Sequence, residues 1–480
     1  MKKLKRLTMI AAALMCGVMA AAVFAGCFVG KDGGGGGGGG GGVIPPEGGT
    51  IQIMWDGTVF LVDFEDIDTE INHMETAIAN GMLEDSVYYR NMIENTKIMR
   101  DHAKERNLSI QSMALGWDDT LTTALTQAFS MEDGPDIIIG EAQLPGFVNN
   151  GYIAPYPDGL AAKIRELCSK ASYTALEKDG KIYGFAITPG LTCLVWNKAL
   201  LRQVYASTDP IIDNGPKDWE QWKEAMSRVY NNINGSGKPP YGGGVYVAPN
   251  TGGYLRTAAL LDSNGGGYAD PDTGAPSINS AQNQQAFQFL RDSRAYNING
   301  ICNASSEETY DKFFSDGETA FKVDGNWAMA YAQEDGIDWG MSLIPPRAEG
   351  GDYGTLLIGA TYMCVPQYSQ NKDHAFYLIE KMLDERIHKN IAEVGRRLPV
   401  LNSVIDSAEF KAGNPKGFEI ADYARNAANL SGLPPFKGRV KDIWNAVGTA
   451  LTSTYITGST PAITAVLNTA QTSMMNEYNR

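Results

Sequence analysis

Aromatic and polar side chains recur where the predicted strands of the amino-terminal half end. They are Trp55, Asp56, Trp117, Asp118, Glu141 and Gln143. In open α/β sheets ligands bind beyond the carboxyl ends of the strands, so these side chains are predicted to share one rim. Aromatic rings cover the C–H faces of sugars, and planar polar groups bind paired hydroxyls, so the chemistry suits a sugar. Each tryptophan is alternatively core, and each aspartate is alternatively a helix N-cap or a solvated loop acid.

The sequence lacks the motifs that mark common enzyme centres. It contains no G-x-S-x-G, no H-E-x-x-H and no P-loop. The acidic residues of 63–70 lack the ligand order of an EF-hand, and we interpret this run as a solvated loop. The histidines fall in predicted helices, where we expect them to face solvent: His73, His102, His374 and His388. We therefore expect no catalytic residue, no metal and no cofactor.

Sequence patterns typical of strands and of helices alternate along the first part of the chain after Thr50. Residues 50–55 and 108–113 predict strands, and 135–140 is the continuous apolar run of a strand buried on both faces. Helices are predicted between them, near 88–107 and 118–130. Strand, helix, strand, helix, strand is the pattern of an open α/β sheet with parallel strands.

A second cycle follows. Two strands are predicted within 182–198, and Asp218 with Gln221 has the spacing of a capping box at the start of a helix. Trp219 and Trp222 share one face of that helix and are predicted to be core. Further helices are predicted at 280–296, 307–316, 372–384, 440–455 and 461–478.

The amino terminus predicts a targeting signal rather than a fold. Residues 1–26 resemble a lipoprotein signal peptide: they have a basic start, an apolar stretch over 7–24 and a pair of small residues before Cys27. The resemblance implies that Cys27 is the acylated residue. The alternative is a signal anchor that stays in the membrane as a helix. A glycine run over 33–42 makes 27–50 a flexible tether. We therefore expect a lipid-anchored protein on the extracytoplasmic face of a bacterial cell membrane.

Charge and cysteine content narrow the class further. The 480 residues carry 40 Lys and Arg against 55 Asp and Glu, a formal net charge of −15. Nucleic-acid binding needs a basic surface, so we exclude it. Beyond the leader the cysteines are widely separated, which favours buried free thiols over disulfides. They are Cys168, Cys193, Cys302 and Cys364.

Several motifs follow one another in a fixed order beyond Thr50. They are 134–138 with 151–155, 179–185 with 195–198, 216–220, and 314–320 with the Asp-Gly-Asn-Trp of 324–327. In this order the chain resembles the extracellular solute-binding proteins of ABC importers, in the carbohydrate-binding group that includes maltose-binding protein. The resemblance covers nearly everything from Thr50 onward. Trp196 is a departure, since the family usually has tyrosine at that position.

The resemblance implies a fold and a function. The fold is the type II periplasmic-binding-protein fold, two α/β lobes joined by three crossovers near 187–191, 344–350 and 398–402, which close on the ligand like a hinge. The amino lobe is expected at 51–188 plus 348–398 and the carboxyl lobe at 189–346 plus 400–480. The protein is expected to be a monomer that binds an oligosaccharide between its lobes and delivers it to the permease subunits of an ABC importer.

The resemblance also adds candidate ligand residues in the second half of the chain. Trp327 and Trp444 match cleft tryptophans of the family, and Trp444 is alternatively a packed helix face. Tyr246 and Asn250 match a sugar-binding segment, and Tyr362 lies in a strand that returns to the amino lobe. Arg397, at the third crossover, is expected to reach a ligand oxygen, with an inter-lobe salt bridge as the alternative.

Two other functions stay open from the sequence. One is a secreted carbohydrate-active enzyme that uses two carboxylates as a glycosidase does. The other is a binding protein for a phosphate ester or a polyamine. Turnover of sugars supports the first, and a site lined by several cations, or only by carboxylates, supports the second.

Overall fold

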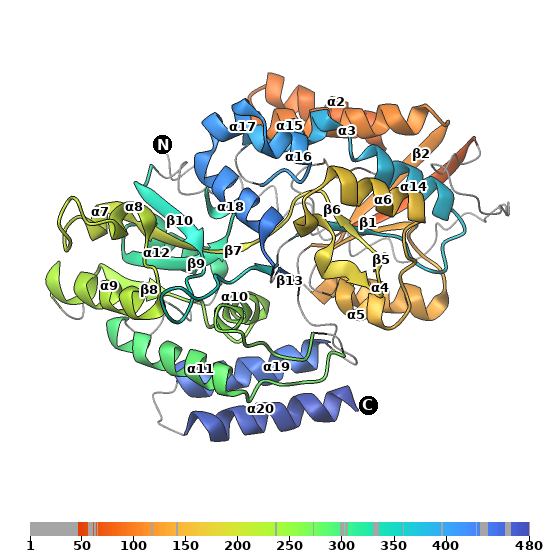
Figure 1. The fold of residues 1–480 in the computed structure, drawn as a ribbon. Helices are drawn as coiled ribbons and strands as arrows, with labels where there is room; N and C mark the ends of the chain where they lie inside the picture. Colours follow the sequence, from red (N-terminus) through yellow and green to blue (C-terminus); the bar gives the residue numbers. More distant parts are fainter. Residues whose placement is uncertain are drawn as a thin grey trace.

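Two large β-sheets, each flanked by helices, organise the described part of the chain, and two two-stranded sheets accompany them (Figure 1). The structure is a computed structural model, and we name the two halves after their sheets, the amino lobe and the carboxyl lobe. The residues that it describes are 47–55, 61, 64, 66–116, 119–140, 143–235, 238–271, 273–297, 302, 306–329, 336–358, 360–394, 397–428, 430–432, 440–456 and 462–479.

The amino lobe is built on a sheet with the order β2-β1-β3-β12-β6. Its strands are β2 (Leu108–Ala114), β1 (Gly49–Trp55), β3 (Ile137–Gly140), β12 (Tyr362–Cys364) and β6 (Phe185–Ala186). The first three are parallel to one another, and β12 runs antiparallel to both of its neighbours. The α/β sheet predicted from three apolar segments is therefore confirmed, and β3 is buried along its whole length, as a central parallel strand should be.

Helices cover this sheet. They are α2 (Ile67–Ala79), α3 (Val87–Lys104), α4 (Asp119–Met131), α5 (Leu144–Asn149), α6 (Asp158–Leu167), α14 (Lys372–Lys381) and α15 (Glu385–Val394). Short elements follow α6: 3-10 turns over Lys170–Ser172 and Thr174–Leu176, and the hairpin of β4 (Glu177–Lys178) and β5 (Lys181–Ile182).

The helix α2 corrects the interpretation of the acidic run as a loop for Asp66, Asp68 and Glu70, whereas Asp63 and Glu65 lie outside the described residues. Asp66 is its N-cap and accepts a hydrogen bond from the Thr69 amide at 2.8 Å. Asp68 and Glu70 lie in the first turn, where negative charge is favourable next to the positive end of the helix. The acidic residues therefore mark a helix start, because carboxylates satisfy amides that the helix itself leaves unpaired.

The expectation that the histidines face solvent is wrong for most of them. His73 is exposed, whereas His374 and His388 are buried and His102 lies between Glu105 and Asp384. His388 in α15 contacts the Met382 carbonyl through Nε2 at 3.1 Å, and its burial lowers its pKa to about 4. The amino lobe therefore buries this imidazole in its neutral form.

The carboxyl lobe is built on a sheet with the order β10-β7-β9-β8. Its strands are β10 (Trp339–Leu343), β7 (Thr192–Asn197), β9 (Thr319–Gly325) and β8 (Tyr241–Gly244). Its helices are α7 (Lys198–Leu201), α8 (Ile211–Asn214), α9 (Trp219–Asn232), α10 (Thr251–Asp262), α11 (Ala281–Ser293), α12 (Glu307–Ser315), α19 (Val440–Leu451) and α20 (Ile463–Tyr478). A 3-10 turn over Arg294–Tyr296 extends α11, and a π-helical turn over Thr452–Ile456 extends α19.

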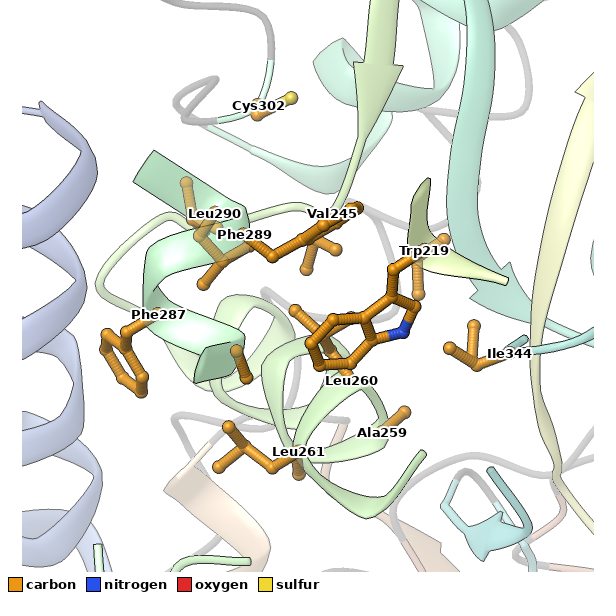
Figure 2. Close-up of a cluster of buried hydrophobic side chains, with 14 of the residues drawn as sticks. Trp219, Val245, Ala259, Leu260, Leu261, Phe287, Phe289, Leu290, Cys302 and Ile344 are labelled. Carbon is orange, nitrogen blue, oxygen red and sulfur yellow. The ribbon is translucent and has the colours of Figure 1, made fainter. Parts of the chain in front are cut away.

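The helix α9 holds the centre of the carboxyl-lobe core. Asp218 caps it by accepting a hydrogen bond from the Gln221 amide at 2.8 Å, as the spacing predicted. Trp219 and Trp222 are buried against Phe289, each with ring centroids 5.1 Å apart. Figure 2 shows Trp219 among Leu260, Phe289 and Ile344. The prediction that these two tryptophans are core is confirmed.

Three passages of chain join the lobes. The first leads from β6 to β7 and the second from β10 to β12. They run side by side, since the Ile358 amide donates to the Gly190 carbonyl at 2.9 Å and Leu191 bridges Leu357. Within the second passage β11 (Leu356–Leu357) pairs with β13 (Ser431–Gly432).

The third passage follows α15. Val400 and Leu401 pack in the amino-lobe core, whereas Leu398 and Ile405 pack with side chains of β7. The chain continues through α16 (Asn402–Ile405) and α17 (Ala408–Gly413), which lie beside α15, and through α18 (Pro415–Asn426), which lies beside β10 (Figure 1). The three crossovers that the resemblance implies are therefore present.

Two further sequence predictions concern the membrane and the thiols. Among the helices in the described ranges, none combines the length and the apolarity that crossing a bilayer requires. Cys27 and the rest of 1–46 lie outside the described residues. Cys168, Cys193, Cys302 and Cys364 are free and buried, which confirms the prediction of buried thiols.

Candidate functional site

The predicted rim of the amino lobe corresponds to one edge of its sheet. Trp55 at the end of β1 pairs with Ala114 of β2 and Ile139 of β3, so the three strands end together. Tyr362 of β12 pairs with Gly140 at the same edge. The residues that follow these ends, Asp56, Trp117, Asp118 and Glu141, lie outside the described residues.

Trp55 itself is in the core of the amino lobe. Its side chain is fully buried, and its ring meets the edge of Phe64 at a centroid distance of 5.9 Å. Sequence reasoning placed this ring at the ligand, and the structure corrects that placement. Side chains alternate between the two faces of a strand, so Trp55 shares the buried face of Ile51 and Ile53. This alternation was the sequence signal for a core role.

Gln143 and Tyr362 lie in the same buried layer. The Gln143 amide nitrogen lies 2.9 Å from the point where a Cβ of residue 140 would stand, so Gly140 leaves room for it. Tyr362 is buried between β3 and β6. The described candidates of the amino lobe, Trp55, Gln143 and Tyr362, are therefore all buried, which corrects the prediction that they reach the ligand.

In the carboxyl lobe, Asn250 connects a helix start to a buried ring. Its Oδ1 accepts from the Gly253 amide at 3.0 Å, which makes Asn250 the N-cap of α10. Its Nδ2 donates to the Tyr246 hydroxyl at 2.9 Å. Tyr246 is buried against Tyr310 with ring centroids 5.1 Å apart, and burial raises the pKa of its hydroxyl. Asn250 is exposed, so it is the member of this pair that a solute can reach.

Trp444 lies on α19, next to the same segment. Its ring is half-buried, and the ring centroids of Trp444 and Tyr254 are 5.3 Å apart. Tyr254 in turn stacks on Tyr268, with ring centroids 4.6 Å apart and an interplanar angle of 19°. One turn further along α19, Gly448 packs against Pro249, which precedes Asn250. Sequence reasoning missed this cluster, because the contact of Tyr254 with Trp444 joins segments far apart in the chain.

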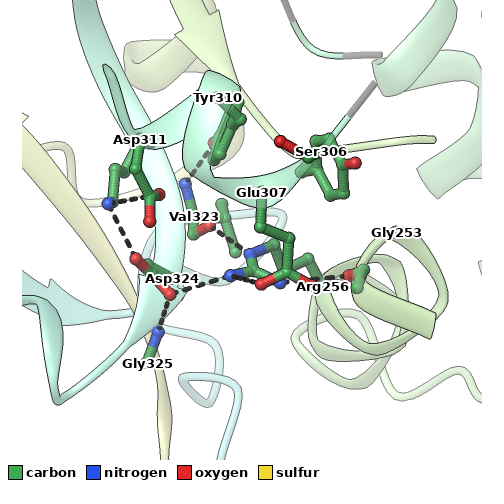
Figure 3. Close-up of polar contacts among 12 residues, drawn as sticks. Gly253, Arg256, Ser306, Glu307, Tyr310, Asp311, Val323, Asp324 and Gly325 are labelled. Atoms are coloured by element: carbon green, nitrogen blue, oxygen red, sulfur yellow. Dashed lines mark hydrogen bonds and ion pairs between the residues drawn. The ribbon is translucent and has the colours of Figure 1, made fainter. Parts of the chain in front are cut away.

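A buried ionic network lies behind these residues (Figure 3). Arg256 of α10 pairs with Glu307 at 2.9 Å and with Asp324 at 3.0 Å, and it donates to the Val323 carbonyl at 3.0 Å. Lys322 pairs with both Asp311 and Asp324 at 2.7 Å. The side chains of Arg256, Lys322 and Asp324 are only 5%, 4% and 0% exposed, so these charges can exist only as pairs.

The two aspartates that share Lys322 differ in their electrostatics. Burial raises the pKa of Asp324, but Lys322 and Arg256 outweigh this effect and hold it below its ordinary value. Burial and the negative charge of Asp324 raise the pKa of Asp311 to about 6. Sequence reasoning missed the network, although Lys322 and Asp324 interrupt an otherwise apolar strand and were a visible signal.

The loop after β9 carries Trp327. Asn326 ties this loop to the first passage, since its Oδ1 accepts from the Leu191 amide at 2.9 Å and its amide donates to the Leu191 carbonyl at 3.0 Å. Trp327 is partly exposed, and the Arg397 guanidinium carbon lies over its ring, 5.0 Å from the centroid. One contact of Arg397 is therefore with an aromatic ring.

The structure thus brings the second-half candidates into one connected region. Tyr246 and Asn250 lie at the start of α10, whose Arg256 holds Asp324, three residues before Trp327. The helix α19, which carries Trp444, packs through Gly448 against Pro249, the neighbour of Asn250, and Arg397 covers Trp327. In the part of the chain that the structure describes, no group of three or more His, Cys, Asp and Glu side chains is placed to hold a metal ion.

Comparisons with known proteins agree with this architecture. The profile of the bacterial extracellular solute-binding proteins matches residues 97–416. A maltotriose-binding protein of Pyrococcus abyssi is 22% identical over 340 residues, covering 69% of this chain and 68% of its own. A galactooligosaccharide-binding protein of Bacillus subtilis is 22% identical over 352 residues, covering 71% of this chain and 76% of its own.

Solved structures with the same fold are more distant in sequence. The maltose/maltodextrin-binding domain from Bdellovibrio bacteriovorus, bound to maltotriose, has a TM-score of 0.62 at 17% identity, covering 90% of this chain and all of that one. A cyclic α-maltosyl-1,6-maltose binding protein from Arthrobacter globiformis has a TM-score of 0.63 at 16% identity. The match covers 89% of this chain and 98% of that one. These likenesses establish the two-lobed type II binding-protein fold.

Proposed function

The chain belongs to the bacterial extracellular solute-binding proteins, whose profile matches two thirds of it, and on this premise we propose that it binds an oligosaccharide between its two lobes. The observation that carries the proposal is the connected region around Asn250, Trp327 and Trp444. Two partly exposed rings and an exposed amide are the groups that a sugar requires. The oligosaccharides named for two relatives agree with this chemistry.

The amino lobe is proposed to complete the site from its sheet edge. Asp56, Trp117, Asp118 and Glu141 come within four residues after the ends of β1, β2 and β3, where a ligand of an open sheet binds. We place this lobe at 51–188 plus 348–398 and the carboxyl lobe at 189–346 plus 400–480. Closure of the two about the three crossovers would enclose the sugar.

The protein is proposed to act as a monomer at the membrane surface. Acylation of Cys27 would anchor it to the outer face of the cell membrane, and the glycine-rich tether would let it approach the permease of an ABC importer. Cys27→Ala is expected to abolish lipid attachment. Unchanged partitioning of the variant into the detergent phase would contradict the anchor.

Binding without turnover is the expected activity. The carboxylates of the network, Glu307, Asp311 and Asp324, are paired with Arg256 and Lys322, so they are committed to structure rather than to proton transfer. A glycosidase needs two carboxyl groups placed on either side of the scissile bond. This favours a binding protein over the carbohydrate-active enzyme.

The test is a screen of the soluble body, residues 47–480, against malto-, xylo-, fructo- and manno-oligosaccharides. A sugar that binds only the folded protein raises the melting temperature. Calorimetric titration should then give one sugar per chain, and chromatography should recover that sugar intact. Absence of binding to the whole panel would contradict the proposal, and hydrolysis would support the enzyme instead.

A further inference from the structure

We infer that Arg397 is a cover on Trp327 that the solute must displace, so that this arginine sets the affinity of the site. The inference rests on the proposed function, in which the ring of Trp327 stacks on a sugar. It adds to that function an internal competitor, a cation of the protein's own chain on the same aromatic surface.

The first step concerns the face of Trp327 that is already occupied. The point where a Cβ on Gly325 would stand has Cζ3, Cη2 and Cε3 of Trp327 as its nearest atoms, at almost equal distances. Three successive ring carbons can be equidistant from one point only if it lies over the ring rather than beyond its edge. The backbone at Gly325 therefore covers one face of the six-membered ring, and only glycine permits this approach.

The second step concerns the face that remains. The Arg397 guanidinium lies over the same ring at 5.0 Å from its centroid, within the range of a cation–π contact. Gly325 takes one face, so we assign the guanidinium to the other. A sugar that stacks on Trp327 needs that same face, and two groups cannot share it.

The third step concerns the elements that hold the two partners. Trp327 follows β9, and Asn326 fixes its loop to the first passage through Leu191. Arg397 directly precedes Leu398, which packs at the third passage. The contact therefore joins the third passage to a loop that is tied to the first passage. Displacement of the guanidinium by a solute would release this contact, which couples occupancy of the ring to the relative position of the lobes.

The experiment compares the wild type with Arg397→Gln and Arg397→Met, which keep much of the side-chain length and remove the charge. Hydroxyl-radical footprinting without sugar, read by peptide mass spectrometry, should show more modification of Trp327 in both variants. Calorimetry with the panel sugars, maltotriose first, should show an affinity gain of about 2- to 30-fold, the range that loss of a competing cation–π contact implies.

Two controls separate this role from a general effect. In a Trp327→Ala background, Arg397→Gln should no longer change the affinity, because the shared ring is gone. Arg106, whose guanidinium carbon lies 5.9 Å from the Tyr377 centroid in the amino lobe, is the matched arginine. Arg106→Gln should leave both the footprint of Trp327 and the affinity unchanged.

The outcomes distinguish the inference from the function beneath it. If both Arg397 variants bind sugar with unchanged or weaker affinity, the inference that Arg397 competes for the Trp327 ring is overturned. The proposed function would still stand. An unchanged footprint of Trp327 would also overturn it. Failure of every panel sugar to bind the wild type and both variants would overturn the proposed function and the inference together.

Discussion

In the carboxyl lobe the candidate ligand residues rest on buried charges, whereas in the amino lobe the described candidates are part of the hydrophobic core. Trp327 and Asn250 lie at the two ends of a scaffold made by Arg256 and Asp324. Trp55 and Tyr362 are buried in the amino lobe among apolar side chains. His388, one of its two buried histidines, has a pKa lowered to about 4 by burial and is therefore neutral near pH 7.

This difference has a physical consequence. Charges in a protein interior are stable only when paired with good geometry, so the network fixes the positions of β9 and α10 relative to each other. Hydrophobic packing stabilises a lobe without requiring one particular contact. Removal of a charge from the carboxyl-lobe network should therefore lower stability and affinity together, whereas truncation of a buried amino-lobe candidate should lower stability alone.

The largest effect is expected at the centre of the network. Asp324→Ala leaves Arg256 and Lys322 buried with incomplete partners, so the free energy of unfolding should fall by about 3–5 kcal/mol. Sugar affinity should fall as well, because the loop of Trp327 follows directly after Asp324. Urea unfolding and calorimetry measure the two quantities. The control is Asp316→Ala at the half-exposed pair with Lys312, where the loss should stay below about 1 kcal/mol.

Trp55→Ala tests the amino-lobe side of the comparison. Removal of a fully buried tryptophan should lower the free energy of unfolding by about 3–5 kcal/mol. The folded fraction should bind sugar with near-normal affinity, since the ring contacts Phe64 in the core. Normal stability combined with lost binding would instead return Trp55 to the rim.

The buried imidazole of the amino lobe predicts a pH dependence. The pKa of His388 falls from an ordinary 6.5 to about 4 in the folded protein, so between these values the unfolded chain binds the extra proton. Stability should therefore be lost as the pH falls below 6.5, by about 1.4 kcal/mol per pH unit from this group. Urea unfolding at pH 7, 6 and 5 measures the free energy of unfolding, which should fall less steeply with decreasing pH in His388→Gln than in the wild type.

The exposed histidine is the control for this pH dependence. His73 is 79% exposed, so His73→Gln should retain the wild-type decline. If the free energy of unfolding fell equally with decreasing pH in the wild type and in His388→Gln, His388 would not titrate in this range.

Trp327→Ala and Trp444→Ala test the carboxyl-lobe rings. Each should weaken sugar binding by about 1–3 kcal/mol, by analogy with aromatic side chains that stack on nucleic-acid bases. Their stability should fall less than that of Trp219→Ala, whose ring is buried and donates to the Pro345 carbonyl at 3.0 Å. Normal affinity with early melting in both variants would assign both rings to the core.

The sequence allowed much of the fold to be predicted, because burial imposes a period. β2 and α9 follow from alternation and from helical spacing, and the cap at Asp218 follows from its distance to Gln221. The same alternation predicts a core role for Trp55, and the rule that ligands bind beyond strand ends had outweighed it. Local pattern therefore deserved the greater weight at that position.

The site was less predictable, because its contacts join distant segments. Lys322 and Asp324 signalled an ion pair in β9, but nothing local identified Arg256 as their partner. The contact of Arg397 with Trp327 depends on where the third passage meets the loop after β9. Such contacts are set by the packing of the lobes, which no short window of sequence contains.

The smallest expected effect separates the two roles of Asn250. Asn250→Ala removes the cap of α10, so the free energy of unfolding should fall by about 1 kcal/mol. Asn250→Ser keeps a capping oxygen but removes the amide, so it should unfold like the wild type. If the amide binds a sugar hydroxyl, both variants should lose affinity in calorimetry, and the serine variant should do so without losing stability. Wild-type affinity in the serine variant would limit Asn250 to capping, and recognition in the carboxyl lobe would then depend on its aromatic rings.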